Sequence, residues 1–150
     1  MSVIQRQTEI HASDAEVFTY LVDVTNHAQW SGHNLKVEKK SEGPVQAGSE
    51  FETVGHQFGE QRDTVTITEA VPNQKIVYEA DGKAGHFRHG FLIENEGDGN
   101  VKLTKTMEIL DARSLPLKVL RPIVSSFIAP KGLDGDLQRI KEKMEATPAG

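Results

Sequence analysis

Cysteine is absent from this chain, and aromatic residues are few. Without thiols there are no disulfide bonds, no thiolate metal ligands and no cysteine nucleophile, while the redox compartment stays open. Aromatic residues make up 6% of the chain, and Trp30 is the single tryptophan. Any catalytic or metal-binding chemistry must therefore come from other side chains.

Long apolar runs and an excess of positive charge are missing as well. No run of about 18 apolar residues occurs, so we expect no transmembrane helix and no stable membrane insertion. The first ten residues have no apolar core preceded by basic residues, so we expect no signal peptide and a cytoplasmic location. The net charge is −5, which favours neither nucleic acid nor an anionic membrane as a partner.

The common motifs of catalytic and cofactor sites are also missing. We find no glycine-rich phosphate loop, no Gly-x-Ser-x-Gly elbow and no His-Glu-x-x-His, so we expect no cofactor. His86 and His89 come nearest to a cluster, but they point to opposite faces of a strand, so we expect no metal site. A Ser-His-Asp triad assembles in space and stays open as an alternative.

The N-terminal part has the pattern of a strand followed by two short helices. Residues 3–11 alternate in polarity as a strand does. Ser13 and Glu16 have the spacing of a capping box, in which the Ser13 hydroxyl accepts from the Glu16 amide and Glu16 reaches back to the Ser13 amide. The first helix should end near Val22, and a second short turn should run to Trp30.

The middle of the chain predicts six strands joined by hairpins. Short segments rich in β-branched and aromatic residues alternate with turns that contain Gly, Pro or Asn, which is typical of an antiparallel meander. The predicted strands are residues 35–42, 49–58, 62–71, 75–81, 86–95 and 101–110.

The C-terminal part predicts a long helix with one apolar stripe. Leu133, Leu137, Ile140 and Met144 recur at helical spacing with charged residues between them. We therefore expect this stripe to form the principal wall of the core.

Residues 117–128 are apolar on most sides of the expected helix. Pro122 and Pro130 should kink or restart it, since proline lacks an amide proton. We favour a bent helix that packs on the sheet. A helix lying on a membrane surface is the alternative, and it is less favoured because Lys118 and Arg121 are the basic residues within the segment.

The order of elements predicts a single α+β domain over residues 1–150. With 37% hydrophobic and 26% charged residues, the composition fits a soluble globular domain. An antiparallel sheet that curves around one long helix satisfies the apolar faces of both. Such an arrangement leaves space for a ligand between sheet and helix.

Four segments resemble the polyketide cyclase/dehydrase branch of the START-like, or SRPBCC, superfamily. They are IHASDAEVFTYLVDVTNHAQW, TITEAVPNQKIVYEA, GDGNVKLTKTMEI and LQRIKEKME, of which the third is the loosest because Asn100-Val101 replaces the usual Thr. The resemblance implies the helix-grip fold, in which a seven-stranded curved antiparallel sheet surrounds the C-terminal helix. It also implies two short helices at one mouth of the grip, with Trp30 near that mouth as a core plug or a ligand contact. Members of this superfamily include cyclases, dehydratases, lipid carriers and hormone receptors.

Polar residues on the middle strands are the candidates for ligand selectivity. Positions 87, 89, 91 and 93 read as an inner face that His89 interrupts once. Arg88 then faces the other way, unless a bulge at Gly55 or Gly90 changes strand parity. The candidate ligand-binding residues are His89, Tyr78, His56, Arg88, Trp30, Phe91 and Phe127, and we assign no catalytic residue.

Three classes of function remain open, and binding of a small hydrophobic ligand of lipid, polyketide or aromatic type is favoured. The alternative is a cyclase- or dehydratase-like enzyme whose polar cavity residues act as general acid and base. The third class is a protein-interaction module, which requires an exposed apolar patch. We expect a monomer or a homodimer.

Overall fold

The computed structural model describes residues 3–31, 35–56 and 60–146, and its elements follow the predicted order. The elements are β1 (Ile4–Ile10), α1 (Asp14–Val22), the 3-10 helix η1 (Val24–Gln29), β2 (Lys36–Lys39), β3 (Glu50–His56), β4 (Glu60–Val71), β5 (Lys75–Gly82), β6 (Gly85–Gly97), β7 (Asn100–Ala112), α2 (Leu115–Ile123), the π-helix η2 (Val124–Ile128) and α3 (Ala129–Ala146). No described helix has both the length and the apolar character needed to cross a membrane.

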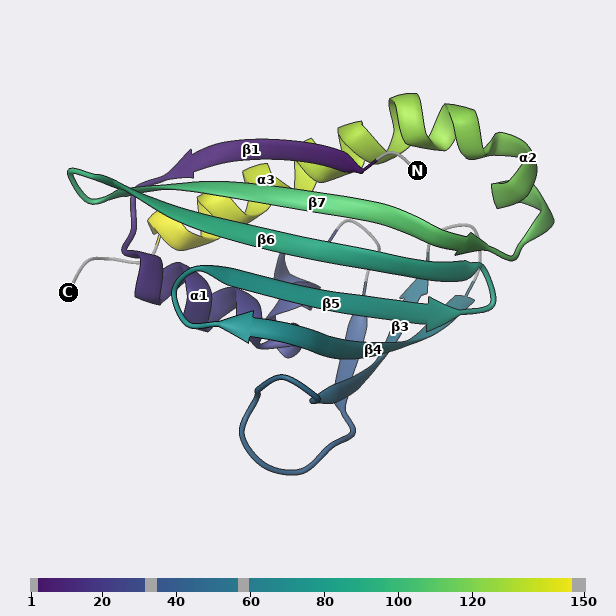
Figure 1. Cartoon of the computed structure of the whole chain (residues 1–150), viewed down its shortest axis with the longest axis horizontal. Coiled ribbons are helices and arrows are strands. Elements are labelled where there is room, and N and C mark those ends of the chain that lie inside the picture. The colour runs from purple at the N-terminus through teal and green to yellow at the C-terminus, as the bar shows by residue number, and fades with distance from the viewer. Residues whose placement is uncertain (1–2, 32–34, 57–59, 147–150) are drawn as a thin grey trace.

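The strands form one antiparallel sheet in the order β1-β7-β6-β5-β4-β3-β2. Figure 1 shows the sheet curving, with α1 and α3 covering one of its faces. The predicted α+β architecture, a seven-stranded curved antiparallel sheet with a long C-terminal helix, is confirmed. We call the helix-covered side the inner face and the opposite side the outer face.

Local hydrogen bonds define the two short helices between β1 and β2. The Ser13 hydroxyl accepts from the Glu16 amide at 3.1 Å, as predicted. The same hydroxyl donates to the Glu16 carboxylate at 3.1 Å, where we expected Glu16 to bond the Ser13 amide. Asp23 then caps η1 by accepting from the Thr25 amide at 3.0 Å, because its carboxylate satisfies a free helix donor.

Strand pairing is continuous through both glycines at which we considered a bulge. Gly55 pairs with Gln61, and Gly90 pairs in register on both of its sides. The irregularities lie elsewhere, between Ile67 and Glu69, His86 and Phe87, and Asn95 and Gly97. Residues 87–93 therefore keep one alternation, and the odd-numbered positions face inward.

Helix α3 lies along β1 and β7 on the inner face. Leu133, Leu137 and Ile140 are buried, and Met144 packs against the core with partial exposure. The fully buried large side chains that surround them come from the sheet and the short helices, among them Phe51, Phe91, Ile10, Leu21, Ile67, Ile76 and Leu103. The predicted stripe thus forms one wall of the core.

The segment before α3 does not pack on the sheet, and that part of our expectation is wrong. No residue of α2 or η2 is buried, and Phe127 is 70% exposed. The reason is length: the 18 residues of α3 span about 27 Å, whereas the 7 residues of β1 span about 23 Å. Because α3 alone covers β1, the helix that precedes it lies past the end of β1, beside the end of β7 (Figure 1).

Replacing the central residue of the α3 stripe should unfold the domain. In Leu137→Asp, a fully buried leucine becomes a carboxylate without a partner, and the combined loss of packing and of hydration is comparable to the roughly 5–15 kcal/mol that stabilise a domain. We expect no cooperative thermal transition by circular dichroism. Leu115→Asp makes the same change at a leucine that is 72% exposed and should melt near the wild type. A Leu137→Asp protein that melts within a few degrees of the wild type would contradict this placement.

Candidate functional site

A cluster of aromatic rings surrounds one lysine on the inner face of the sheet. The Lys105 side chain is 2% exposed. Its ammonium nitrogen lies 4.9 Å from the ring centroid of Phe91, 5.4 Å from that of Trp30 and 6.0 Å from that of Tyr78. Each of these distances lies within the range of a cation–π interaction.

Strand register brings these side chains together. Phe91 on β6 is the partner of Lys105 on β7, and Tyr78 on β5 is the partner of His89 on β6. Directly paired residues share one face of the sheet, so all four point inward. The rings of Tyr78 and His89 stack with centroids 5.0 Å apart and an interplanar angle of 12°.

The 3-10 helix η1 closes the cluster from the other side. His27 and Trp30 are three residues apart, and one turn of this helix places them on the same side. Their ring centroids lie 4.6 Å apart, and the His27 ring lies 5.2 Å from that of Tyr78. Trp30, which we expected near the mouth of the grip, therefore lies inside the core, with 3% of its surface exposed.

His27 is held as a neutral imidazole. Its Nε2 donates to the Leu21 carbonyl oxygen at 3.0 Å. Burial lowers the pKa of His27 from 6.5 to about 4, although the hydrogen bond to Leu21 works in the opposite direction. The positive charge of Lys105 lowers the pKa further, because two cations in this space repel each other.

Burial also lowers the pKa of Lys105, to about 8, against the opposing effect of the Asp136 carboxylate. Asp136 on α3 is already bound to Arg139 at 2.8 Å, and Arg139 donates in turn to the Trp30 carbonyl oxygen. Among the described residues, no hydrogen bond or salt bridge is made to the Lys105 ammonium. The faces of three aromatic rings lie around it instead.

Two further polar groups of the cluster lie in apolar surroundings. Burial raises the pKa of Tyr78 far above its ordinary value of 10.0, so the phenol stays protonated. The indole nitrogen Nε1 of Trp30 is buried without a hydrogen-bond partner in the described part of the chain. Buried donors of this kind call for a physical explanation, because most buried polar groups are paired.

The structure brings four of the seven predicted ligand-binding residues into this cluster and leaves Arg88 and Phe127 outside it. His89, Tyr78, Trp30 and Phe91 belong to the cluster. Arg88 points to the outer face, where it binds Glu108 at 3.1 Å and Glu79 at 3.6 Å. Phe127 lies on η2, away from the sheet, so its expected position inside the cavity is wrong. The side chain of His56 lies outside the described residues.

Sequence reasoning missed Lys105, although the signal was present. Positions 101, 103, 105, 107 and 109 of β7 read Val, Leu, Lys, Met and Ile, which is an apolar face interrupted once. The same pattern singled out His89 on β6. His27 left no such signal, because a six-residue 3-10 helix is too short for its periodicity to identify the buried side.

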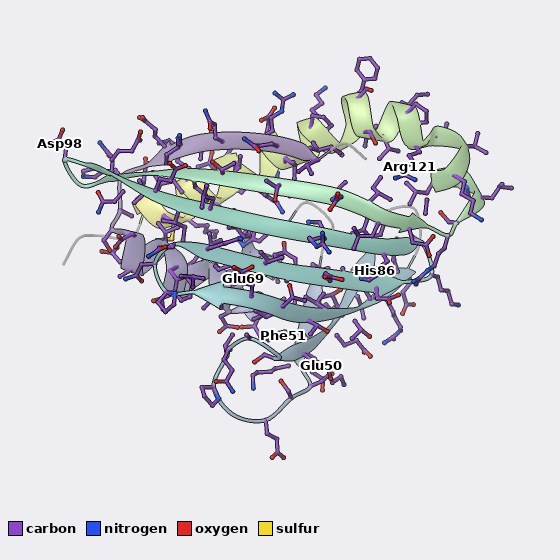
Figure 2. All side chains as sticks on the ribbon, in the orientation of Figure 1. Glu50, Phe51, Glu69, His86, Asp98 and Arg121 are labelled. Carbon is purple, nitrogen blue, oxygen red and sulfur yellow. The ribbon has the colours of Figure 1, made fainter. Side chains whose placement is uncertain are left out.

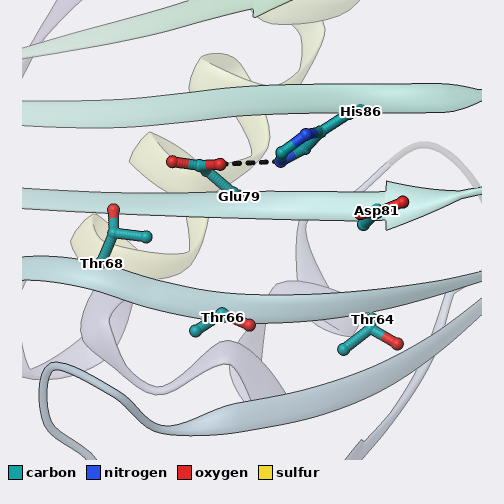
Figure 3. Close-up of a pocket in the computed structure, with 6 residues that line it drawn as sticks. All are labelled: Thr64, Thr66, Thr68, Glu79, Asp81 and His86. Carbon is teal, nitrogen blue, oxygen red and sulfur yellow. Dashed lines mark ion pairs between the residues drawn. The ribbon is translucent and has the colours of Figure 1, made fainter. Parts of the chain in front are cut away.

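Two recesses lie on the surface, apart from the cluster. One, of about 430 Å³, lies on the outer face of the sheet, where His86 Nε2 lies 2.7 Å from a Glu79 carboxylate oxygen (Figure 3). Its lining residues are Thr64, Thr66, Thr68, Glu79, Asp81 and His86. The other, of about 620 Å³, lies between α1, η1 and the end of α3. No group of three potential ligands among the described residues is arranged to hold a metal ion.

Comparison with known proteins identifies relatives of the whole fold. Residues 1–145 match the model of the family described as polyketide cyclase/dehydrase and lipid transport. The Zhui aromatase/cyclase from Streptomyces sp. R1128 is similar with a TM-score of 0.78 and 15% identity, over 96% of this chain and 93% of that one. A START superfamily protein from Mycobacterium smegmatis is similar with a TM-score of 0.78 and 13% identity, over 97% and 99%. No curated protein matches the chain in sequence.

The buried His27 should make the free energy of unfolding depend on pH between about 6.5 and about 4. In this window the unfolded chain binds a proton that the folded chain does not, so stability falls as the pH falls. The loss attributable to His27 is on the order of 3 kcal/mol. His27→Gln keeps a donor for the Leu21 carbonyl but does not titrate, so urea unfolding of the variant should show a shallower pH slope. Equal slopes for both proteins would show that His27 is not buried in its neutral form.

Proposed function

The chain belongs to the polyketide cyclase/dehydrase and lipid transport family, and from this premise we propose that it binds a small hydrophobic ligand carrying an acidic group. The cluster is closed and packed in this structure, so the ligand would enter between the inner face of the sheet and α3 by displacing these side chains. Its polar end would meet Lys105, and its apolar body would lie against the rings of Trp30 and Phe91.

The observation that carries this proposal is the environment of Lys105. Removing an ammonium group from water costs several kcal/mol, and a charge that serves the fold alone is usually paired with a carboxylate. Here the nearest such group, Asp136, is bound to Arg139. Three aromatic rings surround the ammonium instead. A ligand carboxylate, enolate or phenolate would supply the missing anion.

The other polar groups of the cluster support the same chemistry. The Lys105 ammonium, the Tyr78 phenol and the Trp30 indole N–H all donate hydrogen bonds. The raised pKa of Tyr78 keeps its hydroxyl protonated. A ligand end rich in acceptor oxygens matches a set of three donors, whereas an amine or another cation does not.

An enzyme acting on a polyketide-like substrate is a second candidate, and the same donors favour it. Donors directed at a carbonyl oxygen stabilise the enolate that forms when a neighbouring carbon loses a proton. The stacked imidazole of His89 lies next to this group and is of the type that serves as a general base. Nuclear magnetic resonance of a bound ligand before and after incubation separates the two functions, since a carrier returns the ligand unchanged.

Replacing the buried lysine should abolish the preference for an acidic ligand. For the wild type, decanoate should bind more tightly than decan-1-ol, as measured by the emission of Trp30, which is the single tryptophan. In Lys105→Met, which keeps the length of the side chain, decanoate should bind at least tenfold more weakly, while decan-1-ol changes less than threefold. Lys102→Met is the matched control, because Lys102 lies on the same strand and binds Glu94 on the outer face.

The stability of the same variant provides an independent check. Because Lys105→Met removes a desolvated charge that has no carboxylate partner, it should melt at or above the temperature of the wild type. A variant that melts higher but binds decanoate as well as the wild type would show that Lys105 is a structural residue. Equal affinities of the wild type for decanoate and decan-1-ol would also refute the proposal.

A further inference from the structure

Helices α2 and η2 present a row of apolar side chains to solvent. We call this row the α2–η2 face. Exposure of its members ranges from 43% for Leu120 to 72% for Leu115. The α2–η2 face consists of Leu115, Val119, Leu120, Ile123, Phe127 and Ile128. Four of them recur every fourth residue, so they follow one side of the helix.

This helix turns most of its large apolar side chains to solvent. A surface helix normally turns its apolar side to the core and its polar side to water. Here the half-buried residues are Leu117, Arg121, Val124 and Ser125, a mixed set, while the larger apolar side chains face solvent. Arg121 Nη2 donates to the Ile109 carbonyl oxygen at 3.1 Å and joins α2 to β7 (Figure 2). A polar contact thus attaches the helix to the domain and leaves the apolar side outward.

Charge is distributed unevenly around this segment. Residues 112–133 contain no aspartate or glutamate, but they contain Arg113, Lys118, Arg121 and Lys131. Lys118 and Lys131 are exposed on or beside the helix. Arg113 is paired with Asp81 and Asp111, so Lys118 and Lys131 supply the exposed positive charge of this segment in a chain whose net charge is −5.

We propose that the α2–η2 face docks the protein on the surface of an anionic phospholipid bilayer. Apolar side chains would enter the boundary between head groups and acyl chains, and the lysines would contact phosphate groups, as in interfacial amphipathic helices. This proposal does not depend on what the interior binds.

A second copy of the chain is a poorer occupant of this face. Two copies meeting through it would bring their lysines together, and residues 112–133 provide no carboxylate to pair with them. Like charges brought together in an interface oppose association. A bilayer containing acidic lipids supplies negative charge and an apolar medium at once.

The segment is already helical in the protein. The 14 residues of α2 and η2 extend over about 21 Å, and Figure 1 shows α2 at one end of the molecule, beside the end of β7. The Ser114 hydroxyl caps α2 by accepting from the Leu117 amide at 3.3 Å. Because this segment is already helical in the protein without lipid, docking does not require the loss of conformational entropy that accompanies helix formation.

Flotation with large unilamellar vesicles tests the proposal on the full chain. Vesicles of phosphatidylcholine with about 30% phosphatidylglycerol are compared with vesicles of phosphatidylcholine alone. The anionic lipid gives the first kind a strongly negative surface. The wild type should bind the anionic vesicles at least tenfold more tightly, and added salt should weaken this binding. Ile123→Ser and Phe127→Ser should each lower the partition coefficient at least fivefold. Lys118→Gln combined with Lys131→Gln should remove most of the preference for the anionic vesicles.

Leu92→Ser is the matched control, since Leu92 is an exposed apolar residue on β6, away from α2 and η2. It should bind vesicles within twofold of the wild type. Equal binding to both kinds of vesicle, or no binding, would overturn the proposal. A concentration-dependent dimer that Phe127→Ser abolishes would overturn it in favour of self-association through this face.

Discussion

The position of α3 along β1 determines most of what the rest of the molecule does. The helix runs parallel to the strand, and contacts recur along it: Arg6 lies 3.7 Å from Asp134, and Lys141 binds the Glu9 carbonyl oxygen at 2.7 Å. These exposed polar contacts contribute little energy individually. The buried stripe of α3 supplies the stability, and the polar pairs define the register of the helix along the strand.

That register has two consequences, one on the inner side of α3 and one at its N-terminal end. On the inner side it directs Asp136 toward the aromatic cluster. There burial lowers the pKa of Lys105, and the charge of Asp136, which is itself bound to Arg139, offsets only part of that effect. At the N-terminal end of α3 it leaves α2 past the end of β1, where Arg121 joins α2 to β7.

Most of the fold could be predicted from the sequence because alternation and capping are local signals. The six middle strands, the Ser13 cap and the stripe of Leu133, Leu137 and Ile140 are each recorded in a few neighbouring residues. The orientation of α2 could not be predicted, because a row of apolar residues shows that a helix has one apolar side but not what that side meets. Strand parity near His89 was also undecided, since a glycine permits a bulge without requiring one.

The candidate site could be predicted only in part, and for a different reason. His89 and Lys105 interrupt apolar faces on adjacent strands, and either pattern is readable on its own strand. Their proximity to His27 and Trp30 depends on the path of η1 across the sheet, which joins positions far apart in the chain. The distribution of charge could not be read from the net charge of −5 either, because that sum combines a basic segment with an acidic remainder.

The outward apolar row has a consequence for the behaviour of the protein in solution. A contiguous apolar patch attracts other patches at short range, and only the repulsion between like-charged molecules opposes that attraction at longer range. This repulsion disappears as the pH approaches the isoelectric point of about 5.7. The colloidal stability of the protein should therefore be lowest under mildly acidic conditions and at high ionic strength, where molecules approach closely enough for their helices to adhere.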